Sequence, residues 1–294
     1  MSASDDERRA TPLARRLAQE ITANGPIGID AYMRRCLGDR EHGYYRSQEA
    51  IGRTGDFITA PEISQVFGEL IGLWCAVVWQ QMGAPARFNL VELGPGRGQL
   101  IADALRAARI LPGFSDAVEV HLCEINPILR GAQRAQLEAL GLSDEVTWHE
   151  TWPSLANRPT VVLANEFLDT LPGTQWQRLE QGGWAEVRVT VGDGARLAFT
   201  RQPCRPPFDG DPAVPPPPRT DALFTHADFS GIAGDLAAQA ARAPMAALFI
   251  DYGHTATAWG DTLQAVRAHG YEHERREREA RGDEHRGRCS DHHQ

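Results

Sequence analysis

The chain has 294 residues and a formal net charge of −9, a length that allows one large domain or two modest ones with a real core. The acidic balance disfavours a nucleic-acid-binding surface, and without any run of about 18 apolar residues we expect no membrane span. The acidic N-terminus lacks the apolar stretch of a secretory signal, and the five cysteines show no CxxC spacing, so we expect reduced thiols in the cytoplasm and no metal site.

The first third of the chain is predicted to be helical. An amphipathic helix is expected over 7–22, where apolar residues recur at helical spacing, and the Asn-Gly-Pro sequence at 24–26 ends it. A second short helix is expected over 29–37, and a long apolar helix over 64–82.

The loop before the long helix is rich in glycine and small polar groups. It places Asp56, Thr59, Pro61 and Glu62 on an irregular segment upstream of the next strand. Loops that carry polar groups beside a ligand site often close over it, so we expect these residues to cover a site. A solvated loop is the alternative that physical reasoning alone leaves open.

Residues 88–101 carry the pattern around which the chain is organised. An apolar run typical of a buried parallel strand breaks into glycines at every second position, Gly94, Gly96 and Gly98, and a helical pattern begins at Gln99. The glycines let the backbone turn with positive φ and approach a ligand, and the helix start offers free N–H groups. This arrangement predicts a nucleotide-binding corner.

The spacing of this corner favours one class of nucleotide. It reads E-x-G-x-G-x-G, with Glu92 at the strand end, whereas the dinucleotide fingerprint is G-x-G-x-x-G. This form resembles motif I of class I S-adenosylmethionine (SAM) methyltransferases. A second acid is then expected after the next strand to bind the ribose hydroxyls, and Glu124 follows the apolar run 118–123. An ordinary loop and a surface acid are the alternative.

Four segments together resemble one family. The segments 55–72, 91–98, 164–169 and 250–253 are similar to motifs of the MidA-like family of class I SAM-dependent methyltransferases, and the resemblance covers about 26–271. It implies an α/β fold, a Rossmann-like class I SAM-methyltransferase sheet with an N-terminal helical region and a β insertion. The family occurs in bacteria, where a cytoplasmic location is expected, and in mitochondria, where its member is a respiratory complex I assembly factor that methylates an arginine.

Candidate acceptor-site residues follow the fourth and fifth predicted strands. Asn165 and Glu166 end the strand 160–164, at the edge where open α/β sheets bind ligands, and Asp169 lies one helical turn further on. Paired carboxylates suit a guanidinium, which is planar and always charged. Asp251 ends the fifth strand on the same side. A helix-start acid at Asp169 and a structural turn at Asp251 are the alternatives.

These elements predict a division of the chain into five parts. The region 176–222 combines alternating strands, with a Gly-Gly turn, and a Pro-rich stretch that we interpret as an extended surface linker. The parts are a helical region with the active-site loop (1–85), a SAM-binding core (86–175), the β insertion with its linker (176–222), a return to the core sheet (223–271) and a disordered polar tail (272–294).

The last 23 residues differ abruptly from the rest. They hold almost no apolar side chain and many Arg, Glu, Asp and His, a composition that cannot fold alone. The family pattern continues with apolar strands here, so we hypothesise a frame shift near Glu272 that leaves the fifth strand as an exposed sheet edge and removes part of the acceptor site. The histidine spacing is too irregular to indicate metal.

The sequence therefore predicts a SAM-dependent methyltransferase. The resemblance and the carboxylate argument point to an arginine nitrogen of a protein partner, such as a respiratory complex subunit, as the acceptor. A non-catalytic SAM-binding assembly factor, or an inactive truncated form, is the alternative. A dinucleotide dehydrogenase fits less well, because the glycine spacing is wrong. The oligomeric state stays open.

Overall fold

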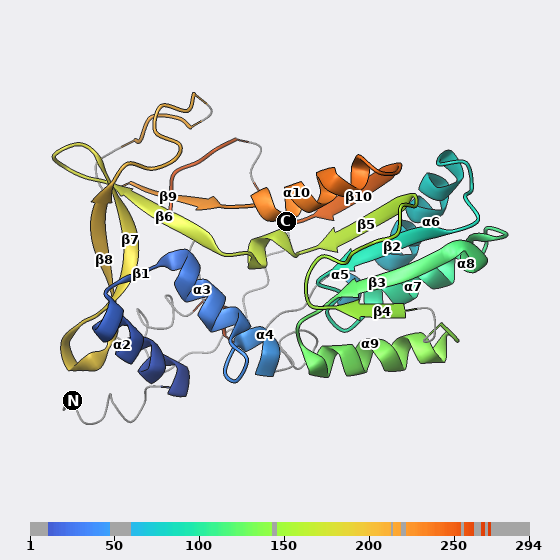
Figure 1. Ribbon diagram of the computed structural model, residues 1–294, viewed down its shortest axis with the longest axis horizontal. Coiled ribbons are helices and arrows are strands. Elements are labelled where there is room, and N and C mark those ends of the chain that lie inside the picture. Colours follow the sequence, from blue (N-terminus) through green and yellow to red (C-terminus); the bar gives the residue numbers. More distant parts are fainter. Residues whose placement is uncertain are drawn as a thin grey trace, which may run out of the picture.

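Two five-stranded sheets organise the molecule, one parallel and one antiparallel (Figure 1). In the computed structural model, the described residues are 11–47, 60–142, 146–212, 214–218, 222–253, 256–261, 266–267 and 270–271. The parallel sheet lies towards the right of the view and the antiparallel sheet towards the left. None of the helices within these ranges is long and apolar enough to cross a membrane.

The parallel sheet has the order β10-β5-β2-β3-β4, with every neighbouring pair parallel. Its strands are β2 (Phe88–Leu93), β3 (Val118–Cys123), β4 (Val146–His149), β5 (Thr160–Asn165) and β10 (Met245–Ile250). The chain moves outwards from β2 through β3 to β4, then crosses to β5 and β10 on the other side. The topological switch point therefore falls between β2 and β5, which confirms the predicted Rossmann-like α/β fold.

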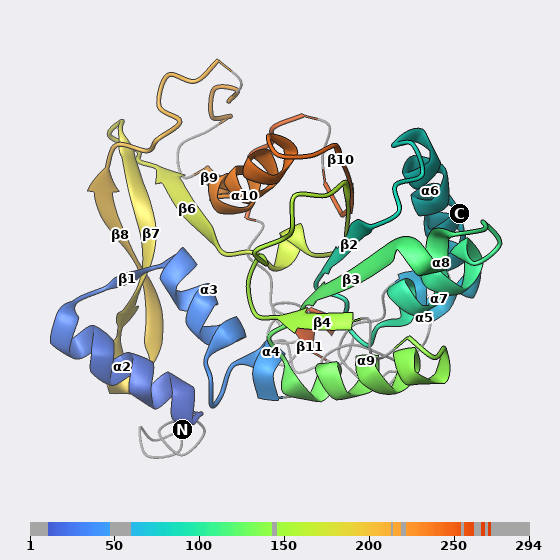
Figure 2. The same cartoon turned by 45° about the vertical axis from the view of Figure 1, so that its right-hand side comes forward.

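Helices cover both faces of the parallel sheet (Figure 2). One face packs its alternate side chains, among them Leu90 and Leu163, in a core shared with four helices, and the other face packs Val91 and Val162 towards α10. The helices on the first face are α6 (Gln65–Gln81), α7 (Gln99–Ala108), α8 (Phe114–Ala117) and α9 (Pro127–Ala139), and α10 is Ser230–Ala240. Burial on both faces explains why apolar residues predominate in β2 and β5, and all six positions of β2 are buried.

The second sheet is antiparallel and has the order β1-β7-β6-β9, with β8 paired to β7. Its strands are β1 (Ile27–Gly28), β6 (Gly173–Arg178), β7 (Trp184–Val191), β8 (Leu197–Cys204) and β9 (Leu223–Ala227). The helices α2 (Pro12–Asn24) and α3 (Ile29–Gly38) lie against it, because Ile21 and Ile29 share a core with Val187 and Val189. The N-terminal region and the β insertion thus form one unit.

Short elements complete the described chain. They are α4 (Tyr44–Ser47), α5 (Ala60–Ile63), the 3₁₀ helices η2 (Leu168–Thr170) and η3 (Asp193–Ala195), and the paired strands β11 (Val266–Arg267) and β12 (Gly270–Tyr271). The predicted long helices are present, and Gly25 ends α2 with a φ of 90°. Among the described strands, β10 pairs with β5 alone and therefore stands at an edge of the parallel sheet.

Two expectations about the insertion need correction. The segment 223–227 does not return to the core sheet, because β9 pairs with β6 in the second sheet. The Pro-rich stretch is not simply a surface linker either. Its Phe208 is buried against Trp176 and Phe224, and the Trp259 indole N–H donates to the Pro215 carbonyl at 2.9 Å. Aromatic burial, which proline content does not reveal, anchors this stretch. The predicted polar tail, 272–294, lies outside the described residues.

Candidate functional site

The turn after β2 is built from glycines in a conformation that other residues rarely adopt. Gly94, Gly96 and Gly98 have φ angles of 64°, 54° and 84°. A Cβ on Gly94 would lie 2.8 Å from the Phe167 ring, and one on Gly98 would lie 3.0 Å from Gln133 Cγ. Glycine is therefore required here both by the backbone and by the close approach of neighbouring groups.

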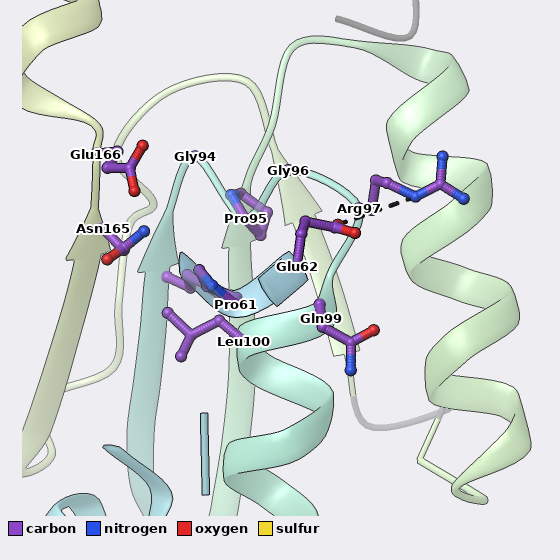
Figure 3. A pocket seen from close by; sticks show the side chains of 11 residues that line it. Pro61, Glu62, Gly94, Pro95, Gly96, Arg97, Gln99, Leu100, Asn165 and Glu166 are labelled. Carbon is purple, nitrogen blue, oxygen red and sulfur yellow. Dashed lines mark ion pairs between the residues drawn. The ribbon is translucent and has the colours of Figure 1, made fainter. Parts of the chain in front are cut away.

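A small cavity of about 40 Å³ opens over this turn, at the switch point between β2 and β5 (Figure 3). Gly94, Pro95 and Gly96 lie in its middle, with Asn165 and Glu166 on the side of β5. The start of α7, at Gln99 and Leu100, forms its floor. Residues that the sequence predicted from separate motifs, among them Gly94, Gly96, Asn165 and Glu166, therefore line one cavity.

Glu92 supplies a buried carboxyl to this cavity. Its side chain is 2 % exposed, and its Oε2 atom has no hydrogen-bond partner. Burial, followed by the nearby charge of Glu124, raises the pKa of Glu92 to about 8. A buried carboxyl without a donor is costly, so an orphaned oxygen that lines a cavity is suited to a ligand that supplies the donor.

Glu124 stands directly after β3 and is 7 % exposed. Its Oε1 accepts a hydrogen bond from the Asn126 amide at 2.7 Å, and burial raises the pKa of its carboxyl to about 7. The Arg130 guanidinium donates to the Glu124 backbone carbonyl at 2.7 Å. The backbone and its neighbours therefore hold this acid at the carboxyl end of its strand, as predicted.

Gln133 links the two halves of the corner, and the sequence analysis missed it. This fully buried side chain donates to the Gly96 carbonyl at 2.6 Å and to Glu124 Oε2 at 3.5 Å, and it accepts from the Trp148 indole at 2.8 Å. Its position midway between the buried Leu129 and Leu137, on one face of α9, is a signal that could have found it. Gln133 sets the position of the glycine turn relative to Glu124.

Two of the predicted loop residues reach the cavity, but they lie in the short helix α5 and not on an irregular segment. Pro61 is buried and lines the cavity, and Glu62 lies opposite Asn165, within 4.0 Å of the Arg97 guanidinium (Figure 3). Partial burial raises the pKa of Glu62. The predictions for Asp56 and Thr59 fall outside the described residues.

Glu166 occupies a strained position at the end of β5. Its φ angle is 48°, in the left-handed region that costs a residue with a side chain about 1–2 kcal/mol. Its amide donates to the Ile250 carbonyl at 2.8 Å, which ties it to β10, and its Oε1 accepts from the Ala60 amide at 3.4 Å. The strain directs this carboxylate to the cavity.

Asp169 and Asp251 lie beyond Glu166 and have different surroundings. Partial burial, then the charges of Asp251 and Glu166, raise the pKa of Asp169 to about 6. Asp251 instead uses both oxygens on the backbone: Oδ2 accepts from the Leu168 amide at 2.7 Å and the Asp169 amide at 3.2 Å, and Oδ1 accepts from the Tyr252 amide at 2.8 Å. Asp251 therefore holds η2 in place.

Two tyrosines that the sequence analysis did not single out stand beside these acids. Burial, followed by the charge of Asp169, raises the pKa of Tyr45 to about 12. The charge of Glu166 is the largest of several effects that raise the pKa of Tyr252, which is exposed at the surface. In the part of the chain that the structure describes, no arginine forms an ion pair with Glu166, Asp169 or Asp251.

Comparison with known proteins agrees with this geometry. Residues 70–278 match the model of a family described as "Putative S-adenosyl-L-methionine-dependent methyltransferase". The chain belongs to this family. The match confirms the resemblance to the MidA-like methyltransferases that the sequence motifs indicated.

Similar proteins include the mitochondrial protein arginine methyltransferase NDUFAF7 of Mus musculus, 34 % identical over 291 residues that cover 90 % of this chain and 65 % of that protein. The Drosophila melanogaster homolog is 36 % identical over 282 residues, with coverages of 87 % and 63 %. A crystal structure of a Burkholderia thailandensis protein bound to S-adenosyl-homocysteine superposes with a TM-score of 0.69, at 29 % identity, over 82 % of this chain and 62 % of that one. The chain thus spans less than two thirds of these relatives.

The residues of the corner fit the cofactor of this family. Three features indicate a site built for a polar ligand: the orphaned Glu92 oxygen, the close approach of Phe167 and Gln133 to the turn, and the start of α7, where the Gly98 N-cap offers no side-chain cap. Gly98 begins α7 as its N-cap, and Glu124 joins the turn through Gln133. Of the predicted acceptor residues, Asn165 and Glu166 line the small cavity, whereas Asp169 and Asp251 line a second one.

Proposed function

We propose that this chain binds SAM and transfers its methyl group to an arginine nitrogen of a protein. The observation that carries the proposal is the orphaned buried carboxyl of Glu92, which shares a cavity with Glu166, together with Asp169 and Asp251, which line a second cavity. Among the described residues, the last three carboxylates have no basic partner. The first is suited to a cofactor with hydrogen-bond donors, and the others to a cationic acceptor. The named activity of the NDUFAF7 relatives supports this assignment.

The glycine turn and the two buried acids would hold the cofactor. Glu124 follows the strand adjacent to β2, where an acid can accept from ribose hydroxyls, and Gln133 keeps it in register with Gly96. Glu92 would accept from a polar hydrogen of the ligand, and the turn lets the backbone approach it. Bound SAM supplies an electrophilic methyl group on a sulfonium.

Glu166 and Asp169 would orient and deprotonate the acceptor. A planar guanidinium takes carboxylate partners in fixed directions, so these acids can align one nitrogen for attack. A nitrogen–carbon bond forms, the carbon–sulfur bond breaks, and the nitrogen loses one proton. A carboxylate whose pKa is about 6, that of Asp169, is ionised at neutral pH and can accept that proton.

A non-catalytic SAM-binding assembly factor is the second candidate, because the glycine turn and the buried acids Glu92 and Glu124 would hold SAM without a methyl acceptor. A respiratory complex subunit as the partner, and the cytoplasmic location expected from the sequence, stay predictions.

Calorimetric titration and a methyl-transfer assay separate these candidates. The purified chain is titrated with SAM and, separately, with NAD, and then incubated with methyl-labelled SAM and arginine-containing peptides. Saturable binding of SAM alone, with label recovered on arginine, is the expected result. SAM binding without transfer to any protein or peptide would favour the assembly-factor role, and binding of NAD in place of SAM would refute both.

A further inference from the structure

A second and larger cavity, of about 350 Å³, adjoins the donor site. Its walls come from both halves of the molecule: α3 contributes Ile29 and Met33, the second sheet contributes β6 and β9, and the parallel sheet contributes the segments after β5 and β10. Figure 2 shows α3 and β6 facing the region between the two sheets. This cavity therefore exists only because the N-terminal region and the β insertion pack together.

The lining of the cavity has two chemical characters. Met33, Leu171 and Phe229 present apolar surface, whereas Asp169 and Asp251 bring carboxylates and Tyr252 brings an aromatic ring. An arginine side chain has the same division, with an aliphatic stem and a flat cationic head. Carboxylates and aromatic faces are the groups that attract a guanidinium.

The two cavities share one stretch of chain. Asn165 and Glu166 line the donor cavity, and Leu168 and Asp169 line the larger one. Glu166 and Leu168 are two residues apart, so their Cα atoms lie within about 7 Å of each other. A side chain in the larger cavity would thus have its head close to the donor site.

We propose that the 350 Å³ cavity is the acceptor chamber, which takes an arginine side chain with its stem against Met33 and Phe229 and its head towards Asp169. The inference rests on the proposed function and adds to it the route of the substrate. It assigns substrate specificity to the N-terminal region and the β insertion, and the parallel sheet keeps the cofactor. Asp251 acts as a positioning residue, because its oxygens hold the amides of η2.

A tryptophan at residue 227 tests this assignment. Ala227 lines the cavity from β9, so A227W places an indole within it, whereas the exposed His226 of the same strand does not line the cavity. H226W is therefore the matched control. We expect both variants to bind SAM within about twofold of the parent, and only A227W to lose arginine methylation, by at least a hundredfold. Unchanged methylation by A227W would overturn the proposal.

A binding measurement tests the cavity independently of methyl transfer. N-acetyl-arginine methylamide and its lysine analogue are titrated into the full chain in the presence of S-adenosyl-homocysteine. The parent should bind the arginine compound in preference to the lysine analogue, and A227W should lose this binding. D169N, which changes the charge with little change of shape, should weaken the binding at least tenfold. If the parent binds the arginine compound and A227W does not, but the parent transfers no methyl group, the result would support the acceptor chamber and reject the proposed methyl transfer. Absence of arginine binding by the parent would reject the chamber.

Discussion

Replacement of Glu92 by glutamine should stabilise the ligand-free protein at neutral pH while it weakens SAM binding. The pKa of Glu92 rises from its ordinary 4.5 to about 8 in the folded protein, chiefly through burial. Between these two pH values the unfolded chain has released a proton that the folded chain keeps. Over this interval the free energy of unfolding therefore falls as pH rises, by about 1.4 kcal/mol per pH unit. Below pH 4.5 the Glu92 carboxyl is protonated in both states and causes no loss of stability.

The magnitude follows from this pH window. At pH 7, two and a half units above 4.5, the accumulated loss is about 3 kcal/mol for this one group. Glutamine has no charge in either state, so E92Q escapes the loss and keeps nearly the same shape. The same exchange replaces a carboxyl that can give up its proton when a donor binds with an amide that cannot, which should weaken SAM binding roughly tenfold or more.

Urea unfolding of both proteins at pH 5 and at pH 7.5, with circular dichroism as the readout, measures the effect. The difference in unfolding free energy between E92Q and the parent should grow with pH, by up to about 3 kcal/mol across this interval. A difference that does not depend on pH, or a variant that is less stable at pH 7.5, would refute the reasoning. Calorimetry on the same samples checks the loss of SAM affinity.

Three further outcomes are expected. Gly94→Ala should destabilise the fold by about 1–2 kcal/mol and lower SAM affinity, because φ is 64° and the new Cβ would meet Phe167; unchanged thermal unfolding would contradict this. Gln133→Leu removes hydrogen bonds to Gly96 and Trp148, so it should lower the free energy of unfolding in urea by about 1–3 kcal/mol and weaken SAM binding. A variant as stable as the parent would show that Gln133 does not hold the turn. The rate of methyl transfer should rise with pH, with a midpoint at about pH 6 where Asp169 ionises. Asp251→Asn should move this midpoint to lower pH, because the charge of Asp251 raises the pKa of Asp169. A midpoint that stays in place would exclude the coupling between the two acids.

The parallel core could be predicted because local pattern determines it. The apolar run of β2 is buried on both faces, the alternate glycines require positive φ, and Asn126 caps α9 through its side chain, accepting from the Ile128 amide at 2.8 Å. Each signal lies within a few residues of its effect. The position of the donor site at the strand ends follows from the same signals.

The second sheet could not be predicted in the same way, since its pairings join distant segments. Ile27 lies opposite Val189, and Trp176 lies opposite Phe224. The two-residue strand β1 is too short for its sequence to predict which strand it pairs with. Phe208 sits in a proline-rich stretch whose composition suggested solvent. The larger cavity depends on these non-local contacts and was therefore invisible in the sequence.

Individual roles at the predicted site also depend on hydrogen bonds that residue type does not specify. Asp169 and Asp251 are equivalent as sequence candidates. In the structure Asp251 accepts three backbone hydrogen bonds, whereas partial burial and the charges of Asp251 and Glu166 raise the pKa of Asp169 to about 6. The same residue type thus acts once as a positioning group and once as a candidate proton acceptor.

The distribution of unfavourable features favours a ligand site over a purely structural role for this region. Asp103 is as fully buried as Glu92, but an ion pair of 2.7 Å with Arg106 compensates it. Glu92 has an orphaned oxygen and Glu166 has a strained backbone in the small cavity, and Asp169 faces two like charges in the larger one. A fold that leaves these carboxyls without a basic partner among the described residues, and pairs Asp103 with Arg106, has the pattern of a protein whose ligands complete its site.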